Sequence, residues 1–228
     1  MKPLERIKRG LVMRAVVAAE DAALGHALRV RLRRALGRPA RVELYFAFDD
    51  PYAAVALRPL REVLRRRFVD FTLFPLVSRG IENDPAADHR APYALVDARR
   101  LARRTGRVLL RSEPISAASM AYLARFTESL RGDPHQADFA EAALDAVWFG
   151  ERLPSPSDMR ALYQRIAGVS PPSTFRKDAA LDRALVNNHA RLIERGHWES
   201  PACWVEGAWY LAHERISQID EHLAKDGF

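Results

Sequence analysis

Two adjacent carboxylates, Asp49 and Asp50, stand between the apolar stretch 41–48 and Pro51. Asp followed by Pro is a preferred start of a helix, because the Asp side chain accepts backbone N–H groups and Pro fits the first helical position. Neighbouring carboxylates can also form a catalytic pair that moves protons. A third interpretation is a site in which acidic residues have replaced a nucleophile. The pattern favours the helix cap and leaves the other two roles open.

Cys203 is the single cysteine of the chain, which excludes an intramolecular disulfide and a C-x-x-C redox pair. It falls inside a predicted strand, where a lone cysteine usually behaves as a small buried hydrophobe. We therefore expect an inert thiol. A chain without disulfides is typical of the reducing cytoplasm, so we also expect a cytoplasmic location.

Other patterns of catalytic or binding residues are missing from the sequence. The seven histidines form no H-x-x-x-H pair and no cluster with ligand spacing, so we expect no metal site. There is no glycine-rich phosphate loop and no G-x-S-x-G nucleophile motif. No apolar run approaches the ~18–20 residues that a membrane-spanning helix needs, so we expect no membrane span.

The net charge of the chain is concentrated at its N-terminus. Residues 1–41 contain eleven Lys or Arg and three Asp or Glu, a net charge of +8, whereas the whole chain carries +7 and the remainder therefore −1. Only four of the 36 basic residues are lysine, a bias that indicates a GC-rich bacterial genome. The basic segment RVRLRRALGR, 29–38, could bind an anionic membrane surface or nucleic acid. We favour a solvated helix that packs on the body or on a partner subunit.

The first part of the chain predicts a helix followed by a βαβ unit. Residues 11–37 have the pattern of an amphipathic helix that ends at Gly37. RVELYFAF, 41–48, is rich in β-branched and aromatic residues and predicts a buried strand. Apolar residues at helical spacing follow over 50–68, and VDFTLFPLV, 69–77, predicts a second strand.

The second part begins with helices alone. From about residue 84 to residue 169 no segment predicts a strand, and proline and glycine separate helical segments at 90–105, 116–131, 134–149 and 156–167. A further helix over about 174–195 precedes PACWVEGAWYL, which predicts two short strands with a tight turn at Glu206-Gly207. The segment AHERISQIDEHLAK predicts a closing helix.

This order of elements is β-α-β, inserted helices, then α-β-β-α. It predicts an α/β thioredoxin-like fold with an all-helical insertion between its halves and an N-terminal helical arm. We assign residues 1–40 to the basic helical arm, 41–83 and 170–228 to the thioredoxin-like domain, and 84–169 to the helical insertion domain.

Three blocks of the sequence resemble one family. YFAFDDPYAAVA, 45–56, stands where that family has an aromatic strand, a Ser-Pro or Cys step and the first helix. LDAVWFGERLPSPSDMRALYQRIAG, 144–168, is similar to its helix end, short loop and next helix. IERGHWESPACWVEGAWYLAHERISQIDEHL, 193–223, is similar to its final third. Over about 42–224 the chain resembles the 2-hydroxychromene-2-carboxylate isomerases and kappa-class glutathione transferases, in the DsbA-like branch of the thioredoxin superfamily.

The resemblance implies a glutathione site. The family serine that hydrogen-bonds the glutathione sulfur maps onto Asp50, where an ionised carboxylate offers only acceptors and adds negative charge, so the usual thiolate activation is lost. Ser200-Pro201 matches the loop whose cis-proline presents backbone groups to a thiol substrate. We expect His213 and Glu214 to begin the last helix, where relatives contact the γ-glutamyl end of glutathione. The resemblance also implies a homodimer.

Two functions follow as expectations. One is a glutathione-dependent isomerase or transferase with glutathione as cofactor, Asp50 in place of the usual Ser or Cys, and the missing hydroxyl supplied by Tyr52, Ser112 or Ser200. The other is a catalytically inactive thioredoxin-fold protein that binds a peptide, thiol or protein partner. The single cysteine argues against a dithiol oxidoreductase. Nucleic-acid binding through the arm is a weaker alternative.

Overall fold

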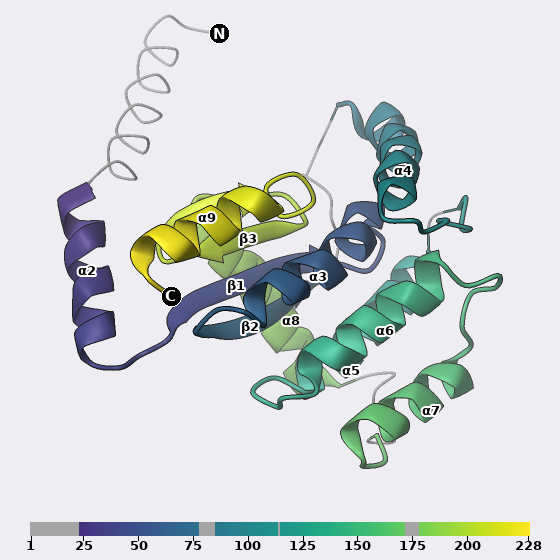
Figure 1. Cartoon of the computed structure of the whole chain (residues 1–228). Helices are drawn as coiled ribbons and strands as arrows, with labels where there is room; N and C mark the ends of the chain where they lie inside the picture. Colours follow the sequence, from purple (N-terminus) through teal and green to yellow (C-terminus); the bar gives the residue numbers. More distant parts are fainter. Residues whose placement is uncertain (1–22, 78–84, 114, 172–177) are drawn as a thin grey trace, which may run out of the picture.

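The fold is given by a computed structural model (Figure 1). The structure describes residues 23–77, 85–113, 115–171 and 178–228, so residues 1–22 of the predicted arm lie outside the described part. The helices and strands, in chain order, are α2 Ala23–Ala35, β1 Ala40–Ala47, α3 Pro51–Leu64, β2 Val69–Leu76, α4 Ala87–Arg104, α5 Ala117–Ser129, α6 Gln136–Trp148, α7 Pro156–Ala167, α8 Ala179–Glu194, β3 Ala202–Val205, β4 Ala208–Leu211 and α9 Ile216–Asp226.

The mixed α/β architecture expected from the sequence is confirmed. Both strands of the βαβ unit and both strands of the hairpin form where the sequence predicts them. The described residues between β2 and α8 contain helices and no strand. In the hairpin turn, Glu206 has φ 47° and Gly207 has φ 120°, the positive values that a tight two-residue connection requires.

The four strands form one sheet in the order β2-β1-β3-β4. β1 pairs parallel with β2 and antiparallel with β3, and β3 pairs antiparallel with β4. β1 is therefore central, and every residue from Val42 to Ala47 is buried. This explains why its sequence is a nearly continuous apolar run rather than an alternating one.

Helices cover both faces of the sheet (Figure 1). α3 and α9 pack side by side on one face, and α8 crosses the other. Side chains of a strand alternate between the two faces. Glu43 of β1 accordingly points towards α8, where its carboxylate accepts hydrogen bonds from Arg191 at 2.7 Å and Arg195 at 2.5 Å.

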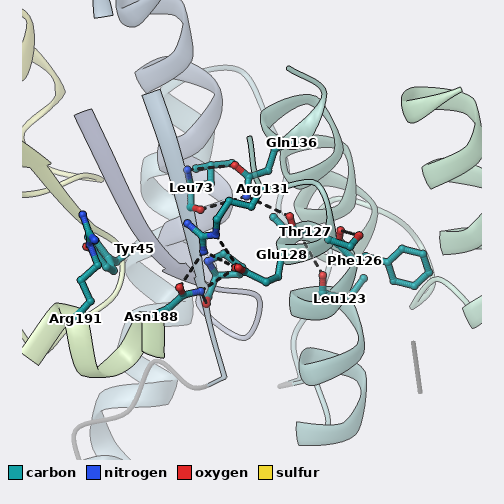
Figure 2. Close-up of polar contacts among 12 residues, drawn as sticks. Tyr45, Leu73, Leu123, Phe126, Thr127, Glu128, Arg131, Gln136, Asn188 and Arg191 are labelled. Atoms are coloured by element: carbon teal, nitrogen blue, oxygen red, sulfur yellow. Dashed lines mark hydrogen bonds and ion pairs between the residues drawn. The ribbon is translucent and has the colours of Figure 1, made fainter. Parts of the chain in front are cut away.

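Side chains of the helices complete the exposed edge of the sheet. β2 is an edge strand, and the amide of Gln136 pairs with it as another strand would: Nε2 donates to Leu73 O at 3.2 Å, and Leu73 N–H donates to Oε1 at 3.4 Å (Figure 2). Asn188 Nδ2 donates to Pro75 O at 2.9 Å and to the buried carboxylate of Glu128 at 2.9 Å. These bonds satisfy backbone groups that an open edge would leave for intermolecular pairing.

The inserted helices are anchored to the thioredoxin-like part near the end of β1. The indole N–H of Trp148, the last residue of α6, donates to Phe48 O at 2.9 Å. Trp148 and Phe48 are both buried. Arg58 of α3 also binds Glu141 of α6 at 2.9 Å. Helix α6 is thus bonded both to the segment that follows β1 and to α3.

The closing helix starts later than the sequence predicts. α9 begins at Ile216, and His213 and Glu214 lie in the turn before it. The turn forms because Ala212 N–H donates to Pro201 O at 3.0 Å, and the N–H of Glu214 donates to Leu211 O at 3.1 Å. The expectation that His213 and Glu214 begin the last helix is therefore wrong.

Candidate functional site

Asp50 closes the N-terminus of α3. Its Oδ1 accepts the backbone N–H of Tyr52 at 3.0 Å, and Pro51 occupies the first helical turn, as the sequence predicts for a helix cap. Its Oδ2 accepts the hydroxyl of Ser200 at 2.8 Å. Both carboxylate oxygens therefore have hydrogen-bond partners within the protein, and the Asp50 residue is 0 % exposed.

Ser200 links this helix start to the cis-proline loop. The Ser200-Pro201 peptide bond is cis, which confirms the sequence expectation. Ser200 Oγ accepts the backbone N–H of Ala47 at 3.0 Å while its own proton goes to Asp50. Ser200 is 3 % exposed. One buried hydroxyl thus joins the end of β1, the start of α3 and the cis-proline loop.

Tyr52 lies at the centre of a second group of side chains beside Asp50. Its ring stacks on the His213 ring with centroids 3.9 Å apart, and its hydroxyl donates to Asp97 Oδ2 of α4 at 3.1 Å. Burial, together with the adjacent Asp97 carboxylate, raises the pKa of Tyr52 well above its usual value. The Tyr52 hydroxyl therefore stays protonated across the physiological pH range and donates its hydrogen bond to Asp97.

Helix α4 covers the same region, beside the start of α3 (Figure 1). Two contacts fix its position. The hydrogen bond from Tyr52 of α3 to Asp97 joins the two helices. Arg90 of α4 lies 3.8 Å from the carboxylate of Glu199, which immediately precedes the Ser200-Pro201 loop. The candidate site is thus bounded by the α3 start, α4, the cis-proline loop and the turn after β4.

The structure also places the other residues that the sequence analysis named. Asp49 is half-buried next to Asp50, and Ser112 is exposed between α4 and α5. The side chain of His213 is 8 % exposed and that of Glu214 is 49 % exposed. The backbone N–H of Glu214 is bound within the turn to Leu211 O. That amide is consequently not oriented as a helix N-terminal anion site.

Cys203 lies in β3 and is completely buried. Burial raises the pKa of the Cys203 thiol, and the nearby Glu43 carboxylate raises it further. A thiolate is the nucleophilic form of cysteine, so this thiol is unsuited to exchange reactions. The expectation of a buried cysteine is confirmed.

The described residues contain neither a group of side chains that could ligate a metal nor a membrane-spanning helix. Within them, no group of three or more His, Cys, Asp or Glu is arranged to hold a metal ion. No helix in this part of the chain combines the length and apolar character that crossing a membrane requires.

Sequence comparison finds no family model and no curated protein that matches the chain, whereas its structure is similar to many solved ones. A 2-hydroxychromene-2-carboxylate isomerase aligns with a TM-score of 0.65 at 18% identity, over 81% of this chain and 95% of that one. The cytosolic disulfide reductase DsbM from Pseudomonas aeruginosa, solved with GSH, aligns with a TM-score of 0.55 at 16% identity, over 81% and 96%. A periplasmic thioredoxin-like protein from Salmonella enterica serovar Typhimurium aligns with a TM-score of 0.52 at 10% identity, over 82% and 83%.

These similarities establish the fold. The chain has the thioredoxin-like fold with inserted helices that is shared by DsbA-like oxidoreductases and 2-hydroxychromene-2-carboxylate isomerase. At identities this low the likeness carries no residue roles, and the chemistry must be argued from the side chains at the site.

Proposed function

We propose that this protein is a thioredoxin-fold binding protein that recognises a peptide or thiol ligand beside cis-Pro201 and performs no thiol–disulfide exchange. Glutathione is the small-molecule ligand we assign to it. The observation that carries the proposal is the buried Asp50 carboxylate, which occupies the α3 N-terminus with both oxygens hydrogen-bonded.

The electrostatics at Asp50 support the proposed absence of thiol chemistry. A helix N-terminus favours one negative charge, and Asp50 already supplies it. A ligand thiolate about 4 Å away would be repelled by about 4 kcal/mol at an effective dielectric constant near 20. The ligand sulfur therefore stays a neutral thiol. Cys203, buried in β3, supplies no alternative nucleophile.

The loop beside Pro201 supports the proposed binding of a peptide backbone. The cis Ser200-Pro201 bond is present. Tyr52 and Glu199 are partly buried, so the Tyr52 ring, which the largely buried His213 ring holds by stacking, and the Glu199 side chain can contact a ligand. The GSH in the DsbM structure supports the choice of glutathione as the first ligand to test.

The test uses the full chain in two assays. In calorimetry, we expect glutathione and S-methylglutathione to bind with similar affinity, because the thiolate is not recognised. We expect His213→Ala to weaken binding and His135→Ala, an exposed histidine before α6, to leave it unchanged. In a disulfide-reduction assay with glutathione we expect no turnover. Turnover would contradict the loss of thiol chemistry, and no binding of either peptide would remove glutathione as the ligand.

A second candidate function is a glutathione-dependent isomerase, which the Tyr52 group favours. Isomerisation moves a proton and places charge on the substrate oxygens, and the Tyr52 hydroxyl, held by Asp97 and His213, is a hydrogen-bond donor that can stabilise such an oxygen. A 2-hydroxychromene-2-carboxylate substrate with glutathione tests it. Under this candidate Tyr52→Phe abolishes isomerisation and leaves glutathione binding intact, whereas absence of turnover by the wild type excludes it.

A further inference from the structure

Helix α2 presents its leucines to solvent instead of to the core. Leu28, Leu32 and Leu36 are spaced by four residues, which puts them on one side of the helix, and they are 69%, 58% and 56% exposed. Val30, on the opposite side, is 5% exposed. A surface helix normally buries its apolar side. α2 has the reverse orientation.

Polar contacts hold α2 in this orientation. Arg33 points towards the body, where its Nε lies 3.1 Å from Glu206 Oε1 and its Nη1 donates to Pro39 O at 3.0 Å. Glu206 is 5% exposed and also accepts the backbone N–H of Arg41 at 2.6 Å. Because Arg33 and Val30 face the body, the leucines stay largely exposed to solvent.

Exposed cations surround these leucines. Arg29 and Arg31 flank the leucine side of α2, and Arg38 follows its end. The turn between α3 and β2 adds a further apolar side chain, Phe68, which is 57% exposed. That turn lies beside the end of α2, because Phe68 O accepts the backbone N–H of Ala40 at 3.0 Å.

We call this the leucine–arginine surface. It comprises Leu28, Leu32, Leu36, Phe68, Arg29, Arg31, Arg38 and the exposed Arg65 and Arg66 of the same turn. A groove of about 460 Å³ between α2 and the hairpin turn continues this surface. Its lining combines apolar side chains, Leu32, Leu36 and Trp204, with the cations Arg29 and Arg38.

We propose that the leucine–arginine surface docks the protein on an anionic phospholipid membrane. Lipid headgroups carry the negative charge that complements the arginines, and the acyl region accepts the leucines, as in interfacial amphipathic helices. A nucleic acid would neutralise the arginines but leave three leucines and Phe68 in water. The exposed leucines therefore favour lipid over nucleic acid.

The geometry also keeps the candidate site free of the membrane. β1 runs from Ala40, beside α2, to Ala47, beside Asp50, and its eight residues span roughly 23 Å. Figure 1 shows α2 at one end of the molecule and α4 at the other. A protein docked through α2 consequently leaves the cis-proline loop facing solution.

The test is sedimentation of the full chain with phosphatidylcholine vesicles, with and without phosphatidylglycerol. We expect binding only to the anionic vesicles and weaker binding at high salt. Leu28→Gln combined with Leu32→Gln should lower the partition coefficient by at least about tenfold, because burying two leucines is worth several times the free energy of a tenfold change.

Matched controls come from α8. Val186→Gln removes an apolar side chain that is 62% exposed, and Arg183→Gln removes an exposed arginine, both outside the leucine–arginine surface. Neither should change vesicle binding. No wild-type binding to anionic vesicles overturns the proposal. So does binding that the leucine variant leaves unchanged, or tighter binding to an acidic peptide or a DNA duplex than to vesicles.

Discussion

The hydrogen bond between Asp50 and Ser200 gives the sharpest prediction about stability. These residues are 150 positions apart in the chain and joined at 2.8 Å in a fully buried environment. Asp50→Ala removes both the helix cap at Tyr52 and the acceptor for Ser200. Ser200→Ala removes the donor to Asp50 and the acceptor for Ala47 N–H. Both variants lose the bond between Asp50 and Ser200, and each also loses one bond that the other keeps.

The size of each effect follows from those contacts. Loss of an N-cap costs about 1 kcal/mol, and loss of a hydrogen bond to a charged group costs about 1.5–3 kcal/mol. Asp50→Ala should therefore lower the free energy of unfolding by about 3 kcal/mol, which for a chain of this size lowers Tm by roughly 6–12 °C. The double variant should be more stable than the sum of the singles predicts, with a coupling energy of about 2 kcal/mol.

Urea unfolding of the wild type, both single variants and the double variant measures this coupling energy. Ser155→Ala serves as the matched control, because Ser155 caps α7 through Asp158 N–H and shares no bond with Ser200. We expect it to cost about 1 kcal/mol and to show no coupling to Ser200→Ala. A coupling energy below about 0.5 kcal/mol between Asp50 and Ser200 would refute the account, since distant independent sites already add to within that range.

Three further predictions concern other buried groups. Cys203 is fully buried with a raised thiol pKa, so native protein should not react with an aromatic disulfide reagent until denaturant is added; rapid native-state reaction would show an accessible thiolate. Gln136→Leu removes the hydrogen bonds to both backbone groups of Leu73. It should lower the free energy of unfolding in urea by about 2–3 kcal/mol. A change smaller than the experimental error would contradict the role of Gln136 at the sheet edge. Burial lowers the pKa of His197, so below about pH 6.5 the unfolded chain binds a proton that the folded chain does not. The neutral imidazole therefore favours the folded state above that pH, and this stability is lost as the pH falls. We expect the Tm of His197→Gln to fall less than that of the wild type between neutral and mildly acidic pH, and an equal fall would contradict this assignment.

The fold could be predicted from sequence because local patterns decide its elements. The apolar run at 41–48 marks a strand buried on both faces, and the Glu206-Gly207 turn fixes the hairpin. The order of the strands in the sheet depends on pairing between distant segments, such as β1 with β3, so no local pattern reveals it. The cis bond before Pro201 likewise followed only from the family resemblance, because the dipeptide itself does not require it.

The site was predicted in part. The sequence indicated that Asp50 caps a helix, but its bond to Ser200 depends on the tertiary fold, which brings β1 and the cis-proline loop together. The sequence indicated Tyr52 and His213 but not Asp97, because Asp97 comes from a helix 45 positions after Tyr52 and the contact between them depends on the fold. The late start of α9 depends on the hydrogen bond between Ala212 and Pro201, which no local pattern reveals.

The orientation of α2 illustrates a different limit. Periodicity identifies an amphipathic helix but not which side faces the body. Here the polar side is held by Glu206, so Arg33 turns inward and Leu28 and Leu32 face solvent. The buried acceptor for Arg33 sits in a hairpin turn far along the chain, and only the structure shows the two together.

The most direct test of the central claim is the ionisation state of bound glutathione. Thiolate absorbance in the ultraviolet, measured at neutral pH, compares the wild type with Asp50→Ser. The account predicts no thiolate signal with the wild type and a clear signal with the serine variant, because removal of the Asp50 charge restores a helix N-terminus that stabilises the sulfur anion. A thiolate signal with the wild type, or none with either protein when both bind glutathione, would contradict the role assigned to Asp50.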